Sequence, residues 1–438
     1  MSGAIGRRLS LAAAVSVLAV ILRYVLSRWI PYHVIRSALD ARAGDGSAEP
    51  YTEALHDRII TATAVAIVLA CAGGYLLWTQ RTAAGKLLGE VSADGIGFLK
   101  SLRASLHRSG PALLVVALTA IAIRLPYLEQ PMRFDESYTF LSYASQPLYV
   151  TIAKYDTPNN HILHSVLLHM VWTCFGSDPA VLRLPAIVAG VLTAVVGGWL
   201  TSRWAGSTAA LLAGVWIATS SPLVEYSTLA RGYTLVHFWV LLIWVVIDEC
   251  LISPSRVAAV LTGVLGALAL WTIPTTLYAG VLLGTWYVVT RRTSSEVRAG
   301  RVVAAMVFPV AVCLVLCGIL YAPAALVSGW AGLAEQSRAT ESMSLPMWFA
   351  QSVEMLTETW RLWTRDLPLP AMLALAGGVV LCGVSDDQKL RSTLRASTLG
   401  VLLMALVVIA QRVSPPPRTW LFLGPVMCCL SACGWAEW

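Results

Sequence analysis

Long apolar runs separated by short polar loops repeat along almost the whole chain. Most of these runs approach the roughly 20 residues that a helix needs to cross the hydrocarbon core of a membrane. The pattern predicts an all-α polytopic membrane protein with about 12–13 transmembrane helices. The apolar runs cover residues 9–30, 59–79, 111–128, 180–201, 208–224, 234–252, 257–272, 275–290, 302–321, 369–384, 397–411 and 419–434.

Two further helical stretches are predicted to lie along the membrane surface instead of crossing it. Residues 160–175 form a short stretch with three histidines, and residues 347–363 place tryptophans among polar side chains. Amphipathic, Trp-rich segments are typical of the boundary between lipid and water. We therefore expect both to be interfacial helices within two long extracytoplasmic loops, residues 129–179 and 323–368.

The basic residues of the loops set the predicted orientation, because cytoplasmic loops of membrane proteins are rich in Lys and Arg. With residues 160–175 on the surface, every basic cluster falls on the cytoplasmic side. These clusters are residues 81–108, Arg203, residues 291–301 and residues 389–395. The loop that follows residues 111–128 then lies on the extracytoplasmic side. The membrane itself is expected to be the plasma or inner membrane. Arg183 and Arg203, near helix ends, are expected to anchor those ends at the interface.

Composition agrees with a membrane protein and excludes several other classes. Hydrophobic residues make up 57% of the chain and charged residues only 13%, well below the charged share of a soluble domain. Residues 1–110 are expected to form a two-helix extension with a basic connector, and residues 111–438 one transmembrane catalytic domain without a separate soluble domain. The net charge of +7 is spread over loops, so nucleic acid is not an expected partner.

The first candidate chemistry lies directly after the apolar run 111–128. Arg133, Asp135 and Glu136 are among the first polar residues beyond that run. Adjacent carboxylates disfavour each other's ionisation, and a nearby apolar phase adds to the effect, which suits a general base near neutral pH. The alternative is that the two acids cap a short helix beginning at Ser137 or lie in water.

Three more polar runs fall on the same predicted side: residues 154–161, 225–233 and 415–420. An enzyme with this arrangement faces away from ATP and nucleotide sugars, so its substrate must be carried by a lipid. Displacing a sugar from a lipid phosphate needs a base and cations that hold the departing phosphate. The candidate phosphate ligands are Arg133, Lys154, Arg231 and Arg418, and the candidate hydrogen-bonding phenols are Tyr138, Tyr226 and Tyr233.

Several of these residues have a second interpretation. Asn160 either contacts sugar or caps the helix that follows it. Tyr226 and Tyr233 are either ligand contacts or members of an aromatic belt. The three histidines follow helical spacing, so His161 is either a substrate contact or, with His164 and His169, a metal ligand.

Five sequence elements in a fixed order give the chain a specific resemblance. They are F-D-E-S-Y-T at 134–139, P-N-N-H-I-L-H-S-V-L-L-H at 158–169, F-G-S-D-P-A-V-L-R-L-P at 175–185, Y-S-T-L-A-R-G-Y at 226–233 and R-T-W-L-F-L-G-P at 418–425. In this order they resemble the GT-C glycosyltransferases, and most closely the branch of the protein O-mannosyltransferases and the lipid A aminoarabinose transferases. The resemblance covers residues 111–434 and is weakest over 293–368.

The resemblance implies a GT-C-like bundle and an inverting sugar transfer from a polyprenyl-phosphate sugar donor to an extracytoplasmic lipid, glycan or protein acceptor. It implies that Asp135 is the catalytic carboxylate with Glu136 beside it, that Arg231 contacts the donor phosphate, and that Arg418 is a cation of the last outer loop. No cofactor is obligatory, and a divalent cation shared by the two acids is an option. Membrane lipids are the remaining expected partners.

Two other classes of function are compatible with a polytopic membrane protein. A transporter or flippase of a lipid-linked glycan would place charged or helix-breaking residues near the midplane and would show internal repeats. A non-catalytic scaffold would have no reason to collect Asp135, Arg231 and Arg418 on one side. The polar residues concentrate at one end of the apolar runs, which favours the enzyme.

Overall fold

The computed structural model describes residues 2–43, 51–79, 81–294, 299–337 and 344–438. Within these ranges the chain is predominantly helical and contains no strand. It divides into two compact units, Met1–Ala93 and Asp94–Trp438. The boundary lies inside a helix, α4 (Arg81–Arg108), and each unit is described by itself.

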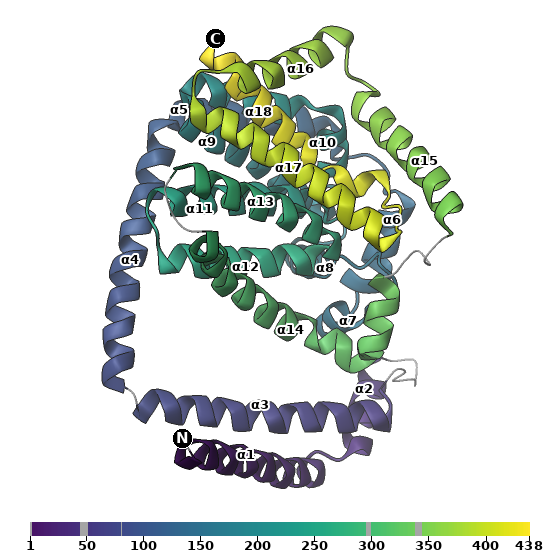
Figure 1. The fold of residues 1–438 in the computed structure, drawn as a ribbon. Coiled ribbons are helices and arrows are strands. Elements are labelled where there is room, and N and C mark those ends of the chain that lie inside the picture. Colours follow the sequence, from purple (N-terminus) through teal and green to yellow (C-terminus); the bar gives the residue numbers. More distant parts are fainter. Residues whose placement is uncertain (1, 44–50, 80, 295–298, 338–343) are drawn as a thin grey trace. The chain divides into compact units, whose positions relative to one another are not determined.

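The first unit contains α1 (Ser2–Trp29), α2 (Tyr32–Ala43) and α3 (Glu53–Thr79). The apolar runs predicted at 9–30 and 59–79 lie within α1 and α3, and these two helices pack against each other (Figure 1). The Tyr51 hydroxyl is 2.8 Å from Nδ1 of His56, and the Tyr51 ring stacks on Tyr32. Aromatic contacts therefore hold the connection between the two long helices.

The second unit is a helix bundle in which α9 packs against α5, α11 and α18 (Figure 1). Three tryptophans, Trp204, Trp244 and Trp286, meet in its core. Its helices after α4 are α5 (Gly110–Arg124), α6 (Phe134–Thr139), α7 (Leu148–Ala153), α8 (Ile162–Phe175), α9 (Pro179–Thr219), α10 (Ser221–Ser227), α11 (Tyr233–Ile252), α12 (Arg256–Thr272), α13 (Leu277–Ser294), α14 (Ala299–Ser337), α15 (Leu345–Thr364), α16 (Leu369–Val384), α17 (Gln388–Gln411) and α18 (Leu423–Glu437).

The long helix α9 is a hairpin of two antiparallel halves. Its backbone breaks at Gly206, where φ is 77°, a left-handed conformation that glycine adopts without a Cβ clash. On either side of the break the halves touch: the Thr201 hydroxyl donates to the carbonyl of Ala209 at 3.2 Å, and a Cβ on Gly198 would lie 2.8 Å from the oxygen of Ala210. The predicted runs 180–201 and 208–224 are thus paired, and Gly206 is the turn between them.

The structure confirms the predicted all-α polytopic membrane class, but with fewer clear spans than the 12–13 expected. Among the described residues seven helices are long and apolar enough to cross a membrane, or eight if α15 and α16, bent by 107°, form one span. The runs 180–201 and 208–224 count once because both lie in α9, and α12 is too short by this measure. The runs 9–30, 275–290 and 369–384 are also not counted as separate spans. The predicted surface stretches 160–175 and 347–363 are helical, as α8 and α15.

Candidate functional site

Glu136, the second of the two predicted loop acids, holds the loop between α5 and α9 in place. Short helix α6 begins at Phe134, three residues earlier than the cap alternative placed it, and Arg133 precedes it in an extended conformation. The Glu136 side chain accepts a hydrogen bond from the backbone N–H of Arg133 at 2.8 Å. This is the reciprocal half of a capping box, which satisfies a donor that the helix start would otherwise leave unpaired.

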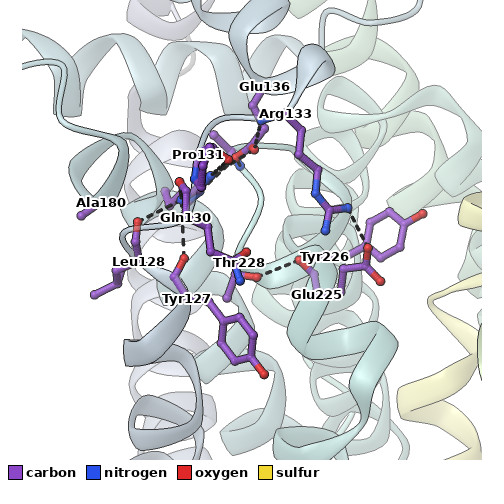
Figure 2. A network of polar contacts seen from close by, with 12 residues as sticks. Tyr127, Leu128, Gln130, Pro131, Arg133, Glu136, Ala180, Glu225, Tyr226 and Thr228 are labelled. Atoms are coloured by element: carbon purple, nitrogen blue, oxygen red, sulfur yellow. Dashed lines mark hydrogen bonds and ion pairs between the residues drawn. The ribbon is translucent and has the colours of Figure 1, made fainter. Parts of the chain in front are cut away.

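Glu136 also forms a buried, two-pronged ion pair with Arg183 of α9. Both side chains are 1% exposed; Nε to Oε1 is 3.1 Å and Nη2 to Oε2 is 3.2 Å. The N–H of Ala230 donates to the same carboxylate at 2.7 Å, so four donors occupy its two oxygens. Arg183 in turn donates to the carbonyl oxygens of Leu128, Gln130 and Pro131; Figure 2 labels these three acceptors. The prediction that Arg183 is an interfacial anchor is wrong. Its guanidinium is buried, and through Glu136 it connects this loop, α9 and the segment before α11.

Asp135, the residue immediately before Glu136, is in the opposite situation. Its side chain is exposed and makes no hydrogen bond or ion pair with any residue in the described ranges. Its backbone carbonyl accepts from the Thr139 hydroxyl at 2.8 Å and from Nη1 of Arg231 at 3.3 Å. Of the two adjacent acids, Glu136 is committed to the scaffold, whereas the Asp135 carboxylate is free to meet a ligand.

Arg231 is a buried cation that has no carboxylate partner among the described residues. The residue is 3% exposed, and it donates to the hydroxyls of Thr139 at 2.9 Å and Tyr233 at 3.4 Å. Its Nε has no hydrogen-bond partner in the described part of the chain. Because burying a charge without a counter-ion is unfavourable, this guanidinium is a natural place for an anion.

His161 lies near Arg231 and is hydrogen-bonded to Gly232, the residue after that arginine. The N–H of Gly232 donates to Nδ1 of His161 at 3.0 Å, which leaves the proton of the neutral ring on Nε2. Burial of the ring, with the positive charges of Arg231 and Arg418, holds the pKa of His161 well below 6.5. A Cβ on residue 232 would lie 2.9 Å from Cβ of His161, so the close contact requires glycine. His161 is therefore a neutral hydrogen-bond donor.

A set of ion pairs, which we call the clasp, connects the first loop to the segment after α15. Glu225 binds Arg133 at 2.7 Å and Arg365 at 2.5 Å (Figure 2 shows Arg133 extended toward Glu225). Arg365 also contacts Asp366, which accepts from the Ser221 hydroxyl at 2.6 Å. Burial alone would raise the pKa of Glu225, but its hydrogen bonds with the two arginines outweigh burial and lower it.

Arg418 and Tyr226 line a pocket of about 630 Å³ beside the clasp. We call it the arginine pocket. The Tyr226 ring meets the Tyr233 ring edge-on at 5.2 Å, which connects the pocket to the surroundings of Arg231. Sequence reasoning missed the contribution of α15, because nothing local in its Trp-rich pattern indicates which helix it meets. The pocket is lined by Tyr226, Glu358, Arg361, Leu362, Thr364, Arg365, Pro416, Pro417 and Arg418.

The other predicted site residues serve the local fold. Asn160 is buried and bonded to the carbonyls of Thr151 and Lys154 and to the Ser165 hydroxyl, so it fixes the loop before α8. Lys154 pairs with Asp156 at 3.5 Å. Asn160 does not cap α8 as the alternative predicted, because the N-cap residue is His161; its side chain bonds within the loop before α8 and to Ser165 instead.

Two further predictions concern rings near α6 and α8. Tyr138 stacks on Phe134, with ring centroids 6.3 Å apart. His164 is fully buried with neither ring nitrogen bonded to a described residue, and Nδ1 of His169 contacts the carbonyl of Ala144. Within the described ranges no three His, Cys, Asp or Glu side chains converge as metal ligands, so the alternative that the three histidines bind a metal finds no site.

A second cluster of charges lies at the far end of the same helices. Arg203 contacts Asp248 and Glu249, each at 2.8 Å, and Lys389 contacts Asp248 at 3.1 Å. From Gly232 to Asp248, α11 rises about 24 Å at 1.5 Å per residue, so this cluster and the site occupy opposite ends of α11. The prediction that Arg203 is an interfacial anchor is also wrong, because its side chain is only 5% exposed within the cluster.

Comparisons with known proteins identify no family, but they find similar solved structures. No family model matches the chain, and no curated protein sequence matches it. Among solved structures it is similar to the archaeal oligosaccharyltransferase AglB from Archaeoglobus fulgidus, in complex with an inhibitory peptide and a dolichol-phosphate, with a TM-score of 0.46 and 11% sequence identity. The match covers 74% of this chain, which spans about half (50%) of that protein. The resemblance of the sequence motifs to the GT-C glycosyltransferases, and to one branch of them, stays a prediction.

Proposed function

We propose that the protein transfers a sugar, with inversion, from a polyprenyl-phosphate donor to an acceptor hydroxyl on the extracytoplasmic side of the membrane. The acceptor is a lipid, a glycan or a protein. The proposal depends on two neighbouring charges that are both without a counter-ion in the described ranges. The Asp135 carboxylate has no side-chain partner there, and the buried guanidinium of Arg231 donates to the Asp135 backbone carbonyl.

In the proposed reaction Asp135 is the general base. Its carboxylate removes the proton of the acceptor hydroxyl as that oxygen forms a bond to the anomeric carbon of the donor. The bond between the anomeric carbon and the phosphate oxygen breaks, and polyprenyl phosphate leaves with the electron pair. Arg231 stabilises the negative charge that gathers on the departing phosphate. The Nε2–H of His161 supplies a further donor.

The lipid part of the donor has a matching place in the bundle. An apolar cavity of about 380 Å³ lies between α11, α12, α13 and α14. Leu270 lines its end near the site, and Thr272, one half-turn further, lies against Gly232. A prenyl chain in this cavity would bring its phosphate to the residue next to Arg231, and its burial would add to affinity through removal of apolar surface from water.

The charge distribution supports an extracytoplasmic site. The opposite end of α11 carries Arg203 and Lys389, and basic residues favour the cytoplasmic side. A divalent ion shared by the two adjacent acids is disfavoured by the geometry, because both oxygens of Glu136 already accept from Arg183 and from backbone N–H groups. The catalytic assignment therefore falls on Asp135, and the part of Glu136 is to hold the loop.

The test is transfer of radiolabelled sugar from synthetic polyprenyl-phosphate donors to envelope extract, by wild type and by Asp135→Asn. General-base catalysis is worth about 10²- to 10⁴-fold, so the variant should be slower by at least about 100-fold. Glu129→Gln is the matched control: Glu129 is an exposed acid of the same loop, without a side-chain hydrogen bond or ion pair in the described ranges, and its loss should leave the rate unchanged. Wild-type transfer by correctly inserted Asp135→Asn protein refutes the base.

A further inference from the structure

We propose that the arginine pocket binds a phosphate group of the acceptor, at a subsite separate from the donor phosphate at Arg231. The inference rests on the proposed transfer reaction and narrows its acceptor to one that carries a phosphate close to the glycosylated hydroxyl. It depends on three features of the pocket: its excess of unpaired cations, its fixed walls, and its separation from the apolar cavity.

The cations of the pocket exceed its anions. Three arginines and one glutamate line it. Arg365 is already neutralised by Glu225 and Asp366, whereas the guanidinium groups of Arg361 and Arg418 make no hydrogen bond or ion pair with any described residue. Arginine presents a planar fork of donors that matches phosphate oxygens in pairs. A phosphate is therefore the ligand chemistry that this lining fits best.

The walls of the pocket are held in place by contacts outside it. Trp348 of α15 donates from its ring nitrogen to the carbonyl of Val413 at 3.1 Å, and the hydroxyls of Ser352 and Ser414 lie 2.9 Å apart. These contacts tie α15 to the segment that carries Arg418, and the clasp fixes Arg365. Arginines that are independently mobile on a surface gain little from an ion pair; arginines brought together by a rigid frame bind an anion with less loss of entropy.

The donor and acceptor phosphates are best assigned to different ends of the site. The apolar cavity approaches the site beside Gly232, next to Arg231, and shares no lining residue with the arginine pocket. A donor whose chain lies in that cavity presents its phosphate to Arg231. A sugar phosphodiester carries a single negative charge, which Arg231 alone matches, and Arg361 and Arg418 of the pocket remain for a second anion.

The two subsites are adjacent, as a transfer reaction requires. Tyr226 lines the arginine pocket and meets Tyr233, whose hydroxyl accepts from Arg231. The positive charge of Arg418 also acts on His161. A volume of about 630 Å³ falls within the range of pockets that hold small organic ligands and admits a sugar phosphate.

Calorimetric binding to the full chain in maltoside detergent, which contains no phosphate, tests the assignment. Farnesyl phosphate is the probe for the prenyl-phosphate part of the donor, and glycerol 3-phosphate is the probe for the acceptor phosphate. Arg361→Gln should weaken glycerol 3-phosphate by about tenfold, as expected for loss of one charged hydrogen bond, and change farnesyl phosphate by less than about twofold. Arg231→Gln should do the reverse. Arg103→Gln removes an exposed arginine of α4 that pairs with no described residue, and it is the control for net charge.

Unchanged glycerol 3-phosphate affinity in Arg361→Gln, equal weakening of both probes by Arg361→Gln, or competition of the two probes for a single site would each overturn the inference. Added phosphatidylglycerol separates two sources of the phosphate: displacement of glycerol 3-phosphate supports a lipid-borne acceptor, and no displacement supports a water-soluble one. The binding experiment is independent of the Asp135 assay. Absence of sugar transfer by the wild-type protein, with two-site binding intact, would refute the reaction and keep the pocket. Wild-type transfer without two-site binding would refute the pocket alone.

Discussion

The two ends of α11 carry similar buried charges in different states. At the far end each charge faces an opposite one: Arg203 meets Asp248 and Glu249, and Lys389 meets Asp248. At the site end Arg231 is buried with its Nε unbonded, close to a carboxylate that has no side-chain partner in the described ranges. Paired buried ions hold helices together, whereas an unpaired one lowers stability unless a ligand neutralises it. The difference marks which end is structural and which is built for an anion.

The site end contains both kinds of charge within two successive residues. Glu136 is saturated by Arg183 and backbone N–H groups, and Asp135 is bare. The saturated acid makes the bare one useful, because it fixes the helix from which Asp135 projects. The following variants are ordered from the largest expected effect to the smallest, and each challenges the contrast between paired and unpaired charges.

Glu136→Gln should destabilise the protein most. It leaves Arg183 buried without a counter-ion, which costs about 3–5 kcal/mol for a buried pair. Thermal unfolding in detergent should show a lower midpoint than for wild type, while Glu129→Gln, which alters an exposed acid of the same loop, should not. An unchanged midpoint for Glu136→Gln would mean that the pair contributes little to the fold.

Asp248→Asn should destabilise the far end by a similar mechanism and to a smaller extent, near the lower end of that range, because Arg203 keeps Glu249 as a partner. The rate of sugar transfer per folded molecule should stay at the wild-type value. A slower rate with an unchanged amount of folded protein would show that the far end is coupled to the reaction, contrary to the division of the two ends.

Arg231→Gln should separate stability from binding. Removing a buried cation that pairs with no carboxylate of the described chain should change the free energy of unfolding by less than about 1 kcal/mol or raise it, while farnesyl phosphate binds at least about tenfold more weakly. The two measurements are made on the same preparation. A large fall in unfolding midpoint would place Arg231 with the structural charges of the far end.

Glu225→Gln should have the smallest effect, and one that depends on pH. The two arginines hold the pKa of Glu225 below its ordinary value of 4.5, so the carboxylate stabilises the fold above pH 4.5 and this contribution is lost as pH falls through the lowered pKa. Wild type should unfold slightly later than the variant at pH 7, and the difference should narrow below pH 4.5. A constant difference from pH 7 to pH 3.5 would rule out ionisation of the clasp as its source.

The local pattern of the sequence predicted the helices and the residues at which chemistry collects. Apolar runs specify helices because every backbone polar group in lipid must be satisfied within the segment. Asp135, Arg231 and Tyr226 were found because polar residues at the ends of such runs are conspicuous. The boundary of α6 and the number of clear spans were less accurate, since helix starts depend on capping contacts and since Gly206 folds two runs into one hairpin.

Only the tertiary structure decided which charges are paired. Arg183 lies 47 residues from Glu136, and Arg365 lies 140 residues from Glu225; no local pattern relates such partners. The local pattern of charges did not distinguish the two adjacent acids, although the motif resemblance pointed to Asp135. They differ in the structure because α9 brings a guanidinium to Glu136 and leaves Asp135 uncovered. The sequence determined that an acid and an arginine would lie at one end of the helices, and the packing of α9 and α11 determined which of them remained free for a ligand.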